Sequence, residues 1–195
     1  PVSHRLANAL VGNTPGDATL EVTLDGPELE FEDRRIVAVC GARFDLSLDG
    51  KPVSDGEAFE VGAGARLRFT TRRQGARAYV GVAGGINVLP VLGSRATHVA
   101  TSMGGLGRRL VTGDVLPLGA VTRPPTIRSP GAVAAGLVRL PSGPSALRIL
   151  PDPLVERSSR DAFAALQSAS YQVAPESDRM GFRLMGQTIE PASTP

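Results

Sequence analysis

Aromatic residues, cysteine and lysine are scarce in this sequence of 195 residues, and tryptophan is absent. Aromatic residues make up only 4% of the chain, and its formal net charge is +2. Surfaces that bind nucleic acids usually combine a basic stripe with aromatic side chains that stack on bases. The composition therefore argues against nucleic-acid recognition.

Cysteine and histidine are too few for the usual disulfide or metal sites. Cys40 is the only cysteine and lies in an apolar run, residues 36–40, which predicts a buried strand thiol rather than a nucleophile. The two histidines, His4 and His98, have no acidic residues spaced around them as in a zinc-binding helix. We expect no metal site, and a single cysteine fits a reducing cytoplasm.

Long apolar runs are also missing. No stretch reaches the roughly 18 apolar residues of a membrane helix, and the N-terminus lacks the basic-then-apolar pattern of a secretion signal. We therefore expect a soluble, cytoplasmic protein. The chain begins at Pro1 and stops in turn-like composition at residues 191–195, and we expect it to be truncated at both ends.

In contrast, 23 glycines and 16 prolines are spread along the chain as turn signals. Helices are predicted only at residues 3–11 and 158–168. The fold class is thus mainly β with a few short helices, in a barrel or a sandwich. The predicted strands are residues 19–24, 28–31, 35–40, 44–48, 51–53, 65–69, 76–83, 147–150 and 171–173.

Residues 119–145 are rich in proline, serine and glycine, a composition typical of linkers and surface loops. We place a boundary between two β-rich subdomains there. The N-terminal subdomain spans residues 1–120, and residues 121–145 form the linker. Residues 146–195 begin a second, incomplete subdomain.

Nearly every basic residue is arginine, and Lys51 is the only lysine. Coding bias explains this pattern, and so does recognition of phosphate or carboxylate by planar guanidinium groups. Residues 104–109, Gly-Gly-Leu-Gly-Arg-Arg, fit either a flexible surface loop or an anion cradle of backbone N–H groups and arginine.

Two further segments, residues 92–97 and 178–184, combine small, polar and arginine residues. In an extended segment Arg179 and Arg183 share one face, because they are an even number of residues apart. A surface ion pair between Asp178 and Arg179 explains the second segment equally well. Composition leaves an anion site and a plain surface pair both open.

The order of these segments resembles a known family. The shared segments are His-Arg-Leu-Ala-Asn at 4–8, Val-Gly-Asn at 11–13, Gly-Ala-Arg-Ala-Tyr at 75–79, Gly-Gly-Ile at 84–86, Leu-Gly-Ser-Arg-Ala-Thr at 92–97 and Asp-Arg-Met-Gly-Phe-Arg-Leu-Met-Gly at 178–186. Over nearly its whole length the chain resembles the second subunit of the biotin-dependent carboxyltransferase family, also called KipA or allophanate hydrolase subunit 2. That family includes 5-oxoprolinase and urea carboxylase components.

The resemblance implies a cyclophilin-like β-barrel that works in a hetero-oligomer with a KipI-like partner. It implies a hydrolase complex, completed by a third subunit, that opens the lactam 5-oxoproline to L-glutamate with ATP. One alternative in the same family is carboxyl transfer to urea, with biotin carried by another chain. A further alternative is non-catalytic, regulatory binding of a partner.

The resemblance also implies the functional residues. The expected catalytic residues, which would contact anionic or carbonyl oxygens, are Arg95, Arg179 and Arg183. The expected substrate-binding residues are Ser94, Asn8, Asn13, Asp178 and Met180. For Asn8 and Asn13, ordering of the neighbouring loop is the more specific expectation.

Overall fold

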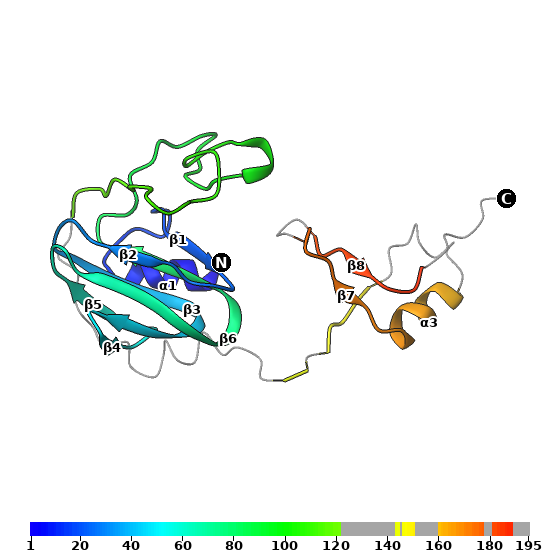
Figure 1. The fold of residues 1–195 in the computed structure, drawn as a ribbon. Coiled ribbons are helices and arrows are strands. Elements are labelled where there is room, and N and C mark those ends of the chain that lie inside the picture. Colours follow the sequence, from blue (N-terminus) through cyan, green and yellow to red (C-terminus); the bar gives the residue numbers. More distant parts are fainter. Residues whose placement is uncertain (122–142, 145, 151–159, 178–180, 189–195) are drawn as a thin grey trace. The chain divides into compact units, whose positions relative to one another are not determined.

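The computed structural model describes residues 1–121, 143–144, 146–150, 160–177 and 181–188 (Figure 1). The chain divides into two compact units, residues 1–144 and 145–195. The finer assignment of a linker at residues 121–145 stays a prediction. Among the described helices, none is long and apolar enough to cross a membrane.

The first unit is built on one six-stranded sheet, with two long antiparallel strands at its centre. These are β3 (Arg35–Leu48) and β6 (Arg66–Val82). Strands β1 (Leu20–Thr23) and β2 (Glu28–Glu30) pair with β6, while β4 (Lys51–Val53) and β5 (Ala58–Val61) pair with β3. The tight turn Asp49-Gly50 joins β3 to β4, as its sequence predicts.

The register between β3 and β6 shifts three times, between Gly41 and Leu46. Side chains alternate between the faces of a regular strand, so Val39 and Leu46 would lie on opposite faces. Because bulges bend a strand and shift its alternation, both instead enter one buried cluster. That cluster also includes Val37, Phe44, Leu67, Phe69, Val80 and Val82. The sheet therefore encloses its main core by bending on itself.

Helix α1 (Val2–Leu10) covers part of the outer face of the sheet. Its buried Ala7 packs with Ala38, Cys40 and Tyr79 in a second apolar cluster. A Cβ at Gly81 would lie 2.7 Å from the Ala7 carbonyl oxygen, so the close approach of helix and strand requires glycine. Burial raises the pKa of the Cys40 thiol to about 12, which confirms a structural strand thiol.

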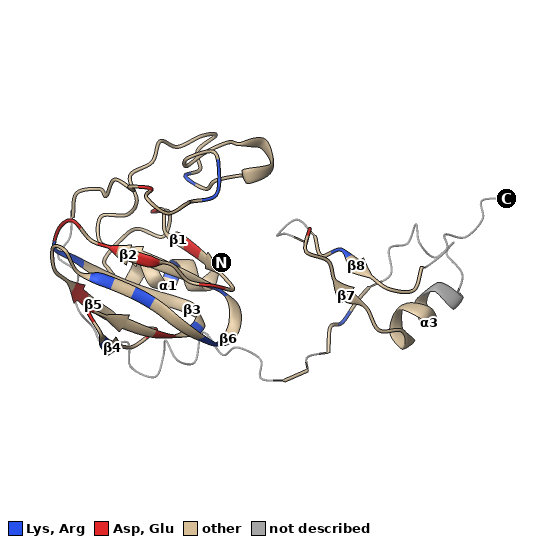
Figure 2. Ribbon diagram, in the orientation of Figure 1, with Lys and Arg blue, Asp and Glu red and all other residues tan. Residues whose placement is uncertain are grey.

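Basic positions on β6 lie beside acidic positions on neighbouring strands (Figure 2), and most of these basic side chains form ion pairs with the carboxylates. The ion pairs are Arg66 with Glu28 and Glu30, Arg68 with Glu28, Arg73 with Asp45, and Arg77 with Glu21. Exposed pairs of this kind contribute little stability individually. On these strands the abundance of arginine is therefore explained by cross-strand pairing rather than by an anion site.

The second unit contains helix α3 (Arg160–Ser168) and the antiparallel pair β7 (Gln172–Val173) and β8 (Leu184–Met185). The predicted helix over 158–168 is confirmed from residue 160 onward, since residues 158–159 lie outside the described part. The strand predicted at residues 147–150 is wrong, because this exposed apolar segment has no strand partner among the described residues.

The mainly β class with few helices is confirmed. The β-barrel that the resemblance implies is not closed: among the described strands, no ladder joins the β1/β2 side of the sheet to the β4/β5 side. Bending at the register shifts buries the core without closure. Two further differences concern strand limits. The sequence predicts pairs of short strands where β3 and β6 each run continuously, and it gives no strand for β5.

Candidate functional site

A long excursion, which we call the apical loop (residues 87–118), follows the end of β6 (Figure 1), and its two ends meet at a narrow neck. Ile86 and Leu118 form an isolated antiparallel bridge at the neck. Gly84 and Gly119 then meet backbone to backbone, since a Cβ at Gly84 would lie 2.2 Å from the Gly119 oxygen. Gly84 also has a φ of 93°, a conformation that favours glycine. The motif Gly84-Gly85 therefore serves close packing of two chain segments.

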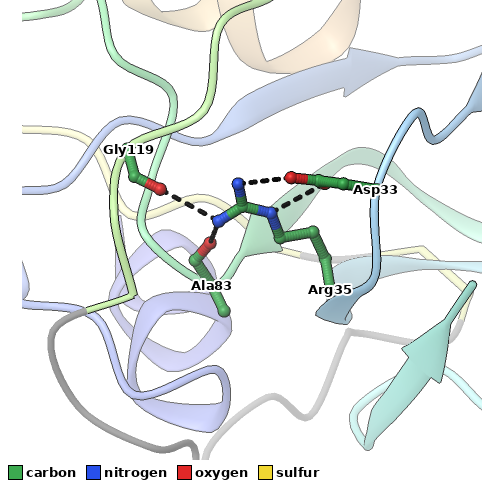
Figure 3. Close-up of polar contacts among 4 residues, drawn as sticks. All are labelled: Asp33, Arg35, Ala83 and Gly119. Carbon is green, nitrogen blue, oxygen red and sulfur yellow. Dashed lines mark hydrogen bonds and ion pairs between the residues drawn. The ribbon is translucent and has the colours of Figure 1, made fainter. Parts of the chain in front are cut away.

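Arg35 holds the two sides of this neck together (Figure 3). Its Nη1 donates to the carbonyl oxygens of Ala83, at 3.2 Å, and Gly119, at 2.9 Å. Its Nε and Nη2 donate to the Asp33 carboxylate at 2.8 and 2.7 Å. The same guanidinium lowers the pKa of the Asp33 carboxyl. Arg35 is thus a clamp fixing the base of the apical loop.

Asn8 and Asn13 form a second polar cluster beside the neck. The Asn13 side-chain nitrogen donates to Asn8 Oδ1 at 3.0 Å and to the Val82 oxygen at 2.8 Å. Asn13 Oδ1 accepts the Gly84 N–H at 2.9 Å, and Asn8 donates to the Asp17 carbonyl oxygen at 2.8 Å. These bonds join the turn after α1 to the end of β6. The geometry thus gives both asparagines a loop-ordering part, and their binding of substrate stays a prediction.

A cavity of about 250 Å³ opens beside Asn13. Its walls combine polar side chains with backbone from both sides of the neck; they are Gly12, Asn13, Thr14, Asp17, Gly84, Ala120 and Val121. Asp17 Oδ2 accepts the Thr14 N–H at 2.7 Å, which fixes the carboxylate in this wall. The cavity could hold only a small polar molecule, because ligand pockets commonly start at about 300 Å³.

Replacing Asn13 with alanine is expected to lower the free energy of unfolding by about 1–2 kcal/mol, because the Gly84 N–H, the Val82 oxygen and buried Asn8 lose a partner together. Chemical denaturation of the intact protein measures this loss. Exposed Asn87, on the adjacent loop, is the matched control, and Asn87→Ala should change stability little. Equal effects of both changes would contradict the assigned role.

Ser94 and Arg95 lie on the apical loop, where a two-residue hairpin turn precedes them. Val91 and Ser94 exchange backbone hydrogen bonds of 2.8 and 3.0 Å across Leu92-Gly93. Ser94 Oγ accepts the Ala96 N–H at 3.1 Å, and Arg95 Nε donates to the Val88 oxygen at 3.2 Å. Within the described part of the chain, no carboxylate pairs with Arg95. Its terminal nitrogens are therefore available to an anion.

The two motif segments of the apical loop are neighbours in space. Gly104 and Gly105 lie against residues 96–97, since a Cβ at Gly104 would be 2.2 Å from the Ala96 oxygen. Both glycines have positive φ, at 70° and 51°. Close backbone packing therefore explains why both positions are glycine. A flexible surface loop, the other interpretation of residues 104–109, is not required to explain them. The packing brings the arginines of residues 92–97 and 104–109 onto one ordered loop.

Arg108 is not free to bind an anion, because it forms a two-pronged ion pair with Asp114. Arg108 Nη1 and Nη2 each donate to one Asp114 oxygen at 2.7 Å. Asp114 also accepts the Val111 N–H at 2.8 Å. Arg108 foremost, and the Val111 N–H next, lower the pKa of Asp114 to about 2. Of the paired arginines at 108–109, only Arg109 is left exposed without a carboxylate in the described structure.

The order of this turn should therefore depend on pH. The Asp114 pKa is lower in the folded protein than its usual 3.8, so its stabilising effect is complete above about pH 5 and is lost as the pH falls through about 2. NMR shifts of the Val111 amide should report a midpoint near pH 2. In Asp114→Asn the transition should be absent. A midpoint at the usual aspartate value would contradict the pairing.

The candidate residues of the second unit are described only in part. Asp178, Arg179 and Met180 lie outside the described residues, so their predicted roles stay predictions. Arg183 is exposed, and its backbone is fixed by bonds from Ala174 N–H to its oxygen at 2.8 Å and from its N–H to Ser177 Oγ at 2.9 Å. Its guanidinium pairs with no carboxylate among the described residues, and its catalytic role stays a prediction.

Sequence reasoning missed the clamp of Asp33 and Arg35 and the carboxylates Asp17 and Asp114. One signal was present: an arginine opens an otherwise apolar strand at residues 35–40, where a charge requires a partner. The partners themselves come from residues 83 and 119, far along the chain. In the described residues, no group of three or more histidine, cysteine or acidic side chains is placed to hold a metal ion.

Fold and site together define a β-sheet module that presents cationic and polar groups on one clamped loop. The chain belongs to the carboxyltransferase domain family, subdomain A and B, whose model matches residues 1–195. The sequence-based resemblance to the biotin-dependent carboxyltransferase family is thereby confirmed.

Individual relatives come from two kinds of enzyme. The chain is 38% identical to a 5-oxoprolinase subunit of Escherichia coli (strain K12), over 95% of this chain and 58% of that protein. It is 34% identical to urea amidolyase of Lachancea kluyveri, over 94% of this chain and 11% of that protein. The crystal structure of Kluyveromyces lactis urea carboxylase matches with a TM-score of 0.78 and 32% identity, over 97% of this chain and 18% of that chain. The chain thus spans little more than half of the bacterial relative.

Proposed function

We propose that this chain is part of the KipA-type subunit of an ATP-dependent 5-oxoprolinase, which opens 5-oxoproline to L-glutamate together with a KipI-like subunit. The observation that supports this function best is the 38% identity to a 5-oxoprolinase subunit over 95% of the chain. That relative is a separate subunit, whereas the urea amidolyase relative carries the matching region as 11% of a longer polypeptide. A cytoplasmic hetero-oligomer follows from this function.

The chemistry requires cations near the lactam. An amide carbonyl is a poor electrophile. Transfer of the ATP γ-phosphoryl group to its oxygen activates the carbonyl carbon for nucleophilic attack by water. Water adds to this carbon, and the ring C–N bond breaks as the nitrogen takes up a proton, which gives γ-glutamyl phosphate. A second water then hydrolyses this acyl phosphate to L-glutamate and phosphate. Negative charge develops on oxygen in each step, and fixed N–H donors or arginines stabilise it. Arg95 fits this role, because its Nε is held by the Val88 oxygen and no described carboxylate neutralises it.

Other predicted residues complete the proposal. Ser94 lies next to Arg95, and its Oγ fixes the turn that presents the guanidinium. We assign Arg179 and Arg183 the same anion-contacting role, and Asp178 and Met180 a part in substrate binding. Asn8 and Asn13 would act on the reaction through the neck that they order.

A second candidate function is carboxyl transfer to urea from carboxybiotin on another chain. The TM-score of 0.78 with urea carboxylase supports it. The same arginine would then contact the carboxylate or the developing oxyanion. A non-catalytic, regulatory role in partner binding is the remaining candidate, and it requires no free guanidinium on the apical loop.

The test is ATP turnover by the intact protein mixed with the KipI-like subunit and the third subunit, with and without 5-oxoproline. Stimulation by 5-oxoproline supports the proposed function. Turnover only with urea and a biotinylated carrier would favour the second candidate. A stable complex that is inactive with both substrates would favour the regulatory one.

A further inference from the structure

The Arg95 guanidinium is tied to the neck of the apical loop. Its Nε donates to the Val88 oxygen at 3.2 Å. Val88 comes directly after the neck, because its own N–H donates to the Ile86 oxygen at 3.1 Å and the Asn87 N–H donates to the Pro117 oxygen at 2.7 Å. The acceptor that holds Arg95 thus lies two residues from the bridge that closes the neck.

Residues 88–95 form a compact turn that begins and ends at this acceptor. Val91 and Ser94 exchange backbone hydrogen bonds, and both residues between them have positive φ, 50° and 77°. This pattern is typical of a type I′ turn, whose backbone geometry is well defined. The bond from Arg95 to Val88 then closes the segment through a side chain. The orientation of the guanidinium therefore depends on where the neck places the Val88 carbonyl.

Arg35 fixes that placement from the sheet (Figure 3). Its Nη1 joins the two sides of the neck by donating to both the Ala83 and the Gly119 oxygen. The Gly119 N–H donates in turn to the Gly85 oxygen at 2.9 Å, one residue before the bridge at Ile86. A series of hydrogen bonds and short backbone steps therefore runs from a largely buried arginine to an exposed one.

Asp33 sets the orientation at the start of this series. Its two carboxylate oxygens accept from Arg35 Nε and Nη2 at 2.8 and 2.7 Å, which aligns the planar guanidinium and leaves Nη1 for the neck. Each guanidinium nitrogen of Arg35 is thus already bonded within the protein. Arg35 is therefore not placed to contact a substrate itself.

We propose that Arg35, oriented by Asp33, is a positioning residue for the Arg95 guanidinium. Preorganised donors stabilise a developing charge because they need not move during the reaction, and a misplacement of about 1 Å can lower a rate about 100-fold. The effect on turnover rests on the proposed function, whereas the dependence of Arg95 on Arg35 does not. The clamp therefore serves the reaction as well as stability.

NMR of the isotope-labelled, intact protein tests this dependence without substrate. The Arg95 Nε–H resonance is identified by its loss in Arg95→Ala. In Arg35→Met it should shift toward the resonance of the Arg109 Nε–H, which has no acceptor among the described residues. Arg34→Met is the matched control and should leave the resonance unchanged, because Arg34 is the adjacent arginine, is exposed and also pairs with a carboxylate.

Asp33→Asn is a second variant that tests the same link if Arg35→Met does not fold. It keeps the Arg35 side chain and one acceptor oxygen but removes the charge that aligns the guanidinium. The Arg95 resonance should therefore shift in the same direction by a smaller amount. Glu60→Gln, which changes the carboxylate paired with Arg34, is the control for this variant and should have no effect on Arg95.

ATP turnover by the assembled complex tests the effect on the reaction. Arg35→Met should lower kcat for 5-oxoproline-stimulated turnover about 10-fold. In an Arg95→Ala background the same change should have no further effect, because the residue through which it acts is gone. A purely structural effect of Arg35 would instead multiply the two losses.

Three results would overturn the proposal. They are an Arg95 resonance that is unchanged in both Arg35→Met and Asp33→Asn, an equal shift in Arg34→Met, and losses of kcat that multiply. A shifted resonance without any 5-oxoproline-stimulated turnover in the parental complex supports the positioning of Arg95 and refutes only the proposed function.

Discussion

Replacing Arg35 with methionine should lower the free energy of unfolding by about 2–4 kcal/mol, because two backbone carbonyl oxygens at the neck lose their donor. The Arg35 side chain is only 13% exposed, so water replaces it poorly. Methionine keeps much of the aliphatic volume, which limits the effect to the lost charge and hydrogen bonds. Chemical denaturation measures the stability. Amide hydrogen exchange should show faster exchange at residues 85–87 and 117–119.

Arg34 is the matched control, since it is the adjacent arginine and also pairs with a carboxylate, that of Glu60. Its side chain is 76% exposed, and Arg34→Met should cost less than about 1 kcal/mol. Arg35→Lys should restore little, because one ammonium cannot reach Asp33 and both carbonyl oxygens in the same geometry. If Arg34→Met and Arg35→Met destabilise equally, the clamp is not a special feature of Arg35.

Replacing Arg95 with alanine should lower kcat for 5-oxoproline-stimulated ATP turnover about 100-fold in the assembled complex. Loss of one donor to a developing oxyanion commonly has an effect of this size. The protein's own stability should change little, because Arg95 is exposed and makes a single described hydrogen bond, to the Val88 oxygen. The assay requires a saturating concentration of the KipI-like subunit, so that weaker docking does not reduce the rate.

Arg72 gives the corresponding control, because it is an exposed arginine with one bond, to the Gly75 oxygen, at the bend of β6. Arg72→Ala should leave kcat unchanged. Arg95→Lys should keep part of the rate, since it keeps the charge and loses the planar donors. Full activity of Arg95→Ala in an intact complex would remove Arg95 from the proposed site.

Local patterns in the sequence predicted most of the secondary structure of the first unit, including α1 and the Asp49-Gly50 turn. They divided β3 and β6 into shorter strands, because the register shifts interrupt the apolar alternation that marks a strand. The sequence patterns did not predict strand β5, because Glu57 precedes its four residues and Glu60 interrupts them. The bend that replaces a closed barrel depends on cross-strand register, which no local pattern specifies.

The candidate site was predicted by residue type rather than by contact. Ser94 and Arg95 lie on one ordered loop, and Asn8 lies in hydrogen-bond contact with Asn13, but these two groups share no described contact. The pairing of Arg108 with Asp114 removed one of two candidate cations, a result that needs three-dimensional proximity. In the sequence, Leu92 is recognised only as the first residue of a motif, because its exposure and φ angle cannot be predicted from local patterns.

The bridge between Ile86 and Leu118 brings the two ends of the apical loop together just beyond the end of β6. The entropy cost of closing a loop rises only slowly with its length. We therefore expect insertions, deletions or exchanges between these two residues to leave the sheet folded. The apical loop is therefore a self-contained segment whose length and sequence can be changed separately from those of the bent sheet.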